Sequence, residues 1–161
     1  MSVDKVHGGV GTVVISCVDE KEQPQELRLT VTPLSIAAER ILGAELKAMV
    51  TADRRRMCRE ALEEIGKIAE PTWADRQAVS ELVTMSVGGV TFADLMAKRF
   101  DVEGIAVELY HRARAAHPKL TLDQVRAVIT VANAGDVSDQ LEKILKAGQT
   151  DKKSGPAAAG G

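Results

Sequence analysis

The residues most capable of chemistry in this sequence are three histidines and two cysteines. His111 and His117 lie six positions apart and so on different helix faces, whereas metal ligands on one helix are spaced by three or four residues. His7 lies in a glycine-containing leader. We therefore expect all three histidines on the surface. Cys17 and Cys58 match no metal or redox spacing, and two lone thiols are typical of a reducing compartment.

No motif for nucleophilic or phosphate chemistry accompanies them. No serine or cysteine stands in a GxSxG or papain-like context, and Cys58 adjoins Met57 in an apolar helical stripe, which favours a small buried hydrophobe. The segment HGGVGTVV precedes a strand, whereas phosphate-binding loops lead from a strand into a helix. Paired acids such as Glu63 and Glu64 indicate a solvated helix face. A triad of distant residues stays open, but the sequence predicts no enzyme, cofactor or metal site.

Two basic clusters raise the question of nucleic acid. The run Arg54–Arg56 is followed by acids at i,i+4 spacing, which pairs Arg56 with Glu60 and Arg59 with Glu63. The second cluster ends a predicted helix, where cations complement the helix dipole. It contains Arg112, Arg114 and Lys119. The formal charge of −2 lacks the basic excess of a DNA-binding domain, so we expect a structural use of both clusters.

Trp73 and Tyr110 are the only tryptophan and tyrosine of the chain. Such side chains are enriched at the energetic centres of interfaces, so either is a candidate anchor for a partner. In a chain with only 2% aromatic residues, however, a tryptophan at a helix start more often covers the core. We expect Trp73 to do so.

The elements that must position these residues begin with a β-hairpin. Val10–Val18 is apolar and β-branched, and Glu26–Thr32 alternates apolar with polar residues, the period of a half-buried strand. The polar segment DEKEQPQ connects them. A lone hairpin is marginal in water, so helices must cover it, and we expect Val10–Val18 to be the better-covered strand.

From Pro33 onward the period becomes helical. LSIAAERILGAELKAMV predicts one helix, and Thr51 and Asp53 are start signals for another, which ends before Pro71. The apolar stripe of that second helix is Met57, Ala61, Ile65 and Ile68. Each of the next helices has a candidate cap, and Gly88-Gly89 separates the first two. These caps are Thr72 with Asp75, Thr91 with Asp94, and Asp101.

The C-terminal helices carry the clearest local signals. Pro118 ends one helix, Thr121 and Gln124 form a capping box, and Leu120 can pack on Val125. Asp136 is the candidate cap of the last helix. The two predicted apolar stripes are Leu122, Val125, Ile129 and Ala132, then Val137, Leu141, Ile144 and Leu145.

The predicted fold class is mainly α, a bundle of about six or seven short helices with an N-terminal β-hairpin. Residues 1–8 are expected to be a flexible leader and residues 9–147 a single domain, with the hairpin at about 9–32. Residues 148–161 are small, polar and repetitive, which predicts a disordered tail. No apolar run reaches the roughly 18 residues of a membrane span and no signal peptide is evident, so the predicted location is the cytoplasm.

Three stretches resemble the tail assembly chaperones of long-tailed bacteriophages, prophages and gene transfer agents. They are QELRLTVTPLSIAAERILG, DVEGIAVELYHRARAAHPKLTLDQV and ITVANAGDVSDQLEKIL, together rather more than a third of the chain. Their likeness lies in a pattern of lengths and caps, without a catalytic fingerprint. Between Thr51 and Gly89 the chain has about two helices more than the compact family pattern.

The resemblance implies a non-enzymatic protein that keeps the apolar, helical tape-measure protein soluble until tail-tube subunits assemble around it. Its implied partners are the tape-measure and tail-tube proteins, without a cofactor. The composition predicts no membrane partner, and the charge balance disfavours nucleic acid. The partner-binding residues are unknown at this level. Two alternatives stay open, a structural or adaptor protein of the phage tail or neck, and a small nucleic-acid-binding regulator.

Overall fold

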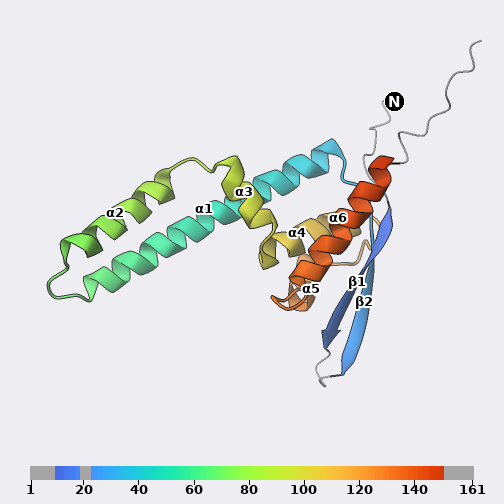
Figure 1. Ribbon diagram of the computed structural model, residues 1–161, viewed down its shortest axis with the longest axis horizontal. Helices are drawn as coiled ribbons and strands as arrows, with labels where there is room; N and C mark the ends of the chain where they lie inside the picture. Colours follow the sequence, from blue (N-terminus) through green and yellow to red (C-terminus); the bar gives the residue numbers. More distant parts are fainter. Residues whose placement is uncertain (1–9, 19–22, 151–161) are drawn as a thin grey trace, which may run out of the picture. The chain divides into compact units, whose positions relative to one another are not determined.

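The computed structural model describes residues 10–18 and 23–150 and has a mainly α fold with an N-terminal β-hairpin, as predicted (Figure 1). The expected leader, residues 1–8, and residues 151–161 of the expected tail lie outside the described residues. In chain order, the elements are β1 (Gly11–Val18), β2 (Pro24–Val31), α1 (Ile36–Gly66), α2 (Trp73–Val87), α3 (Phe92–Arg99), α4 (Val102–Ala113), α5 (Leu122–Val128) and α6 (Ala134–Thr150).

The described chain forms two compact units. The hairpin unit combines the residues up to Leu42 with those from Arg99 onward, and the helical unit is Gly43–Lys98. Helix α1 belongs to both, because it runs without a break through the boundary. This continuity corrects the expectation of a second helix starting near Thr51. The Thr51 hydroxyl donates to the carbonyl of Lys47 within the helix, so its side chain does not cap a new one.

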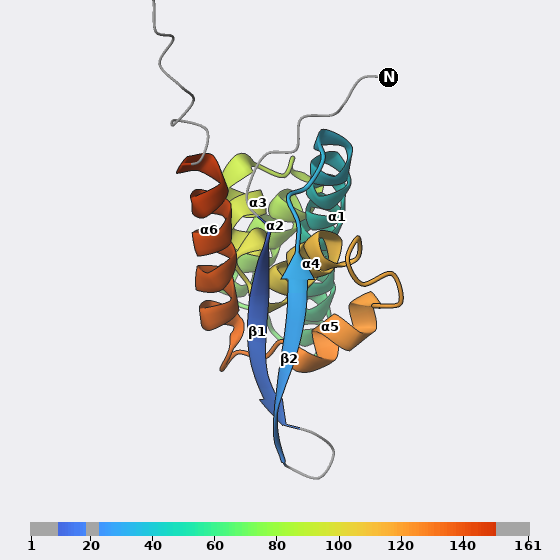
Figure 2. The same ribbon diagram turned by 90° about the vertical axis from the view of Figure 1, so that its right-hand side faces the viewer.

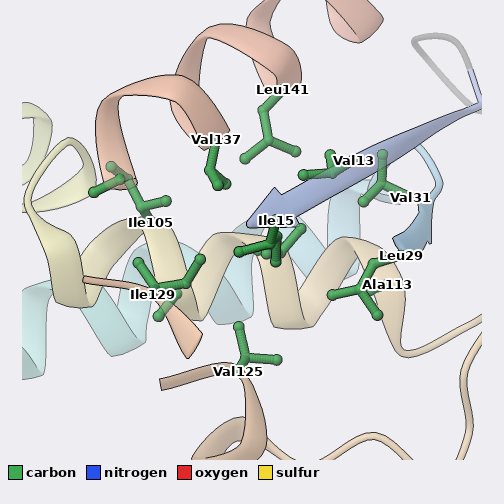
Figure 3. Packing of buried hydrophobic residues seen from close by; sticks show 13 residues of the cluster. Val13, Ile15, Leu29, Val31, Ile105, Ala113, Val125, Ile129, Val137 and Leu141 are labelled. Carbon is green, nitrogen blue, oxygen red and sulfur yellow. The ribbon is translucent and has the colours of Figure 1, made fainter. Parts of the chain in front are cut away.

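The two strands of the hairpin are antiparallel, with Val13 opposite Leu29 and Gly11 opposite Val31. Each strand buries alternate residues, and Val13 and Ile15 are completely buried. Within Val10–Val18, the strand expected to be the better covered, Val10 and Val18 are exposed, because only one face of the hairpin meets the core. The core cluster comprises Val13, Ile15, Leu29, Val31, Ile105, Ala106, Leu109, Ala113, Val125, Ile129, Ala134, Val137 and Leu141 (Figure 3).

Helix α4 lies at the centre of the hairpin unit, where β2, α5 and α6 pack around it. Nine of its twelve residues are buried, among them the charged Glu108 and Arg112. The Glu108 carboxylate accepts from Nε of Arg99 at 2.6 Å and from Nε of Arg112 at 2.9 Å. Glu39 of α1 lies 3.5 Å from the Arg112 guanidinium. Two guanidinium groups therefore share one buried carboxylate, which satisfies charges that burial would otherwise penalise.

Most of the predicted helix caps are confirmed. The Thr72–Asp75 and Thr121–Gln124 capping boxes are present, and Asp101 accepts from the amide of Gly104 at 2.7 Å. The Thr91 amide and hydroxyl donate to Asp94. The equivalent hydrogen bonds from Thr72 and Thr91 lower the pKa of Asp75 and Asp94 below the usual range.

The last helix differs from the prediction at both ends. It begins at Ala134, so Asp136 lies in its first turn and accepts from Gln140 instead of capping the helix. Asn133 stands before the helix, where its side-chain oxygen accepts from the amide of Thr130 at 2.8 Å. The helix continues to Thr150, into the stretch expected to be a tail. The helix therefore begins three residues earlier than a cap at Asp136 would place it.

Replacing Glu108 by alanine is expected to destabilise the protein by about 3–5 kcal/mol, because it leaves the buried Arg112 guanidinium without its main counter-charge. Chemical denaturation measures the loss. Glu39→Ala is the matched control, since the Glu39 side chain is 44% exposed, and its loss is expected to stay within about 1 kcal/mol. Equal losses for the two variants would contradict the role assigned to Glu108.

The same carboxylate predicts a pH dependence. Burial raises the pKa of Glu108, but hydrogen bonds and charges from Arg99 and Arg112 outweigh it and bring the pKa below 4.5. A lowered folded-state pKa contributes stability that is complete above 4.5 and is lost as the pH falls through the folded-state value. Below pH 4.5, the unfolding free energy of the wild type should therefore fall more steeply than that of Glu108→Gln, as measured by urea titrations at successive pH values.

Candidate partner-binding surface

The two histidines in the described part of the chain lie in different surroundings. His111 is buried with 4% exposure, and its ring lies 5.5 Å from that of Tyr110. The expectation of a surface position is therefore wrong for His111, because α4 is covered on nearly every side. His117 is half-buried and its Nε2 accepts from the amide of Thr30, while His7 lies outside the described residues. The described part of the chain contains no cluster of three or more metal-ligating side chains.

The other reactive candidates have structural surroundings. Cys58 is buried, as predicted, and Cys17 is half-buried; both are free thiols. Glu63 and Glu64 are exposed, in agreement with a solvated face. Tyr110 is half-buried and packs against the core cluster.

The two basic clusters are used differently from each other. On α1, Arg56 lies 3.9 Å from Glu60, the predicted i,i+4 pair. Arg112, in contrast, is only 3% exposed and binds Glu108, so a buried ion pair and not the helix dipole alone accounts for it. Arg114 and Lys119 are exposed. Arg56 and Arg112 thus each form an ion pair within the protein.

The helical unit exposes most of the large apolar side chains that the described surface presents. They are Met57, Leu62, Ile68, Trp73, Val83, Met85, Val87 and Phe92. We refer to these eight residues as the apolar surface of the helical unit. Only Leu46, Val50 and Cys58 are buried hydrophobic residues in the described structure of this unit. The helical unit therefore exposes more large apolar side chains than it buries.

Helix α2 contributes most to this surface, because none of its residues is buried. Trp73, Val83 and Val87 follow one another at spacings of ten and four, which places them on one side of the helix. Trp73 is 77% exposed and Val87 80%. The expectation that Trp73 covers the core is therefore wrong. Its position in the first turn directs the ring outward, whereas the half-buried residues of α2 include Val79 and Leu82.

The apolar stripe predicted from Met57 to Ile68 also differs from the structure, because α1 ends at Gly66 and Ile68 lies beyond it. Met57 and Ile68 are 49% and 44% exposed, while Ala61 and Ile65 are half-buried. Helical periodicity alone identified the apolar residues but not the angle at which neighbours would cover them. Met57 is therefore part of the apolar surface of the helical unit.

Polar contacts hold the helical unit together where its core is small. From α1, Arg54 forms an ion pair with Asp94 at 2.7 Å and donates to the carbonyls of Met85 and Gly89. Asp53 accepts from Lys98 at 2.7 Å. Because Met85 lies in the last turn of α2 and Asp94 in the first turn of α3, Arg54 binds the facing ends of both helices.

Three of the grooves on the described surface lie on α2 and beside the hairpin. The groove lined by Gln77, Ser80, Glu81, Thr84 and Met85 lies on α2 itself. The other two flank the hairpin, with volumes of about 570 and 560 Å³. The uncovered apolar side chains of the helical unit are of the kind that binds another macromolecule.

Comparison with protein-family models, with curated proteins and with solved structures finds no match to this chain. Within the described residues, no single helix is both long enough and apolar enough to cross a membrane. Helices α2 and α3 meet that criterion only as a pair, bent by 92°.

Replacing Arg54 by alanine is expected to loosen the helical unit selectively, because it removes the ion pair to Asp94 and two carbonyl contacts. Hydrogen exchange of the amides in α2 and α3 should accelerate about tenfold, while that of α4 stays unchanged. Arg55→Ala is the matched control, since Arg55 is exposed and forms no ion pair with a described residue. Equal acceleration in both variants would refute the role of Arg54.

Proposed function

We propose that the chain is a non-enzymatic phage tail assembly chaperone, which binds the tape-measure protein and keeps it soluble while tail-tube subunits assemble. The observation that carries the proposal is the apolar surface of the helical unit, above all α2, which has no buried residue. The resemblance of three sequence stretches to that chaperone family supports the identity of the partner. Such a role requires no catalytic group and takes place in the host cytoplasm.

The apolar surface is suited to a helical, apolar partner. Trp73 and Phe92, each 77% exposed, provide large aromatic contacts of the kind that dominate binding energies. Met57 and Met85 add flexible side chains that adapt to different partner residues. An amphipathic helix laid along the side of α2 that carries Trp73, Val83 and Val87 would cover apolar area that is now in water.

Co-expression with the tape-measure protein tests the proposal. The wild type should keep that protein in the soluble fraction and co-purify with it, whereas Trp73→Ser/Val87→Ser/Phe92→Ser should lose at least about tenfold in affinity. The control is Val18→Ser/Val131→Ser, which changes equally exposed residues of the hairpin unit. Circular dichroism checks that both variants fold. Equal binding by all three proteins, or none by the wild type, would refute the proposal.

A structural or adaptor protein of the tail differs from a chaperone because it remains in the mature particle. The chaperone leaves when the tube has assembled, so mass spectrometry of purified particles should not detect it. Stoichiometric recovery from mature particles would favour the adaptor role.

A further inference from the structure

A two-stranded sheet has two outer edges, and α6 closes that of β1. The amide of Val14 donates to the side-chain oxygen of Gln140 at 2.8 Å, and the Gln140 side-chain nitrogen donates back to the Val14 carbonyl at 2.9 Å. The Asn133 side chain donates to the Ser16 carbonyl at 3.2 Å. Figure 2 shows α6 along this side of the hairpin. Side chains thus replace a third strand there.

The outer edge of β2 is closed over only part of its length. The amide of Thr30 donates to His117 and the amide of Thr32 to the carbonyl of Arg112, both at 2.9 Å. Main-chain groups of alternate residues point to the same side of a strand, so those of Arg28 and Glu26 also point away from β1. No described residue bonds these outward groups. The segment Glu26–Arg28 is therefore an open edge, and a groove of about 560 Å³ lies beside it.

The open edge is complementary to itself. Glu26 and Arg28 carry opposite charges, lie on the solvent face of β2 and are 56% and 70% exposed. The half-buried Leu27 lies between them and points to the core side. An antiparallel copy of this segment places Glu26 opposite Arg28 of the second copy, and Arg28 opposite its Glu26.

We propose that β2 pairs with β2 of a second copy of this chain about a two-fold axis at Leu27, which joins two hairpins into a four-stranded sheet. Both outward-facing residues of each copy then exchange main-chain hydrogen bonds. Two cross-strand ion pairs form on the solvent face, and the two Leu27 side chains meet on the core face, beside the groove lined by Leu29, Pro118 and Leu120.

Charge selects this register over its neighbours. A shift in either direction that preserves the hydrogen-bond pattern places Glu26 opposite Glu26 or Arg28 opposite Arg28, and like charges directly opposite are destabilising. The amide of Thr30 already donates to His117, and Pro24 has no amide hydrogen. The pairing therefore ends at both sides of Glu26–Arg28. The interface is short, and its affinity depends on these few groups.

Charge reversal with light scattering or sedimentation tests the pairing on the full chain. The wild type should form a concentration-dependent dimer, whereas Glu26→Arg alone and Arg28→Glu alone should raise its dissociation constant about tenfold or more. A mixture of the two variants should form the heterodimer, because each brings the charges that the other now requires.

Arg28→Pro with Arg28→Ala as its control tests the main chain. Proline removes the outward amide without removing a bond to β1, because Arg28 stands opposite Val14, whose own amide and carbonyl point to Gln140. The proline variant should be monomeric, and the alanine variant should retain more dimer. A monomeric wild type, single-reversal variants that dimerise like the wild type, or a mixture that stays monomeric would overturn the proposal.

Discussion

Burial of α4 on nearly every side is the constraint on which the hairpin unit depends. A two-stranded hairpin is too small to stand alone, and packing its inner face on α4 supplies the missing core. Because buried charges require partners, Glu108 holds Arg99 and Arg112 in one cluster. Arg112 also anchors β2, since its carbonyl accepts from the amide and the hydroxyl of Thr32. Arg112 thus takes part in the buried ion-pair cluster and also attaches the end of the hairpin to α4.

The helical unit follows the opposite principle. Its few buried apolar residues contribute little hydrophobic stabilisation, and Arg54 and Asp53 hold its helix ends by polar contacts. Units with few buried apolar contacts open at a lower free energy than a well-packed core. For a protein proposed to bind a helical partner, this distribution is useful, because the main core lies in the hairpin unit while the helical unit keeps its apolar side chains available.

Local signals predicted most elements of the fold. The alternation in Glu26–Thr32, the capping boxes at Thr72 and Thr121 and the cap at Asp101 depend on neighbours within a few residues, so the sequence alone contains them. The continuity of α1 escaped prediction, because Thr51 and Asp53 are equally compatible with a cap and with a helix interior. The candidate site was harder to predict from the sequence. Trp73 was identified as a possible anchor for a partner but was expected to pack against the core.

The sequence by itself determined which segments become strands or helices and which residues are apolar, since these depend on backbone preferences and spacing. Only the tertiary structure decided which face of each helix is covered. His111 and Arg112 are buried because neighbours surround α4, whereas Trp73 and Val87 are exposed because nothing described covers that side of α2. Periodicity defines a stripe on one helix, but burial depends on elements far away in the chain, and these converge only in the folded protein.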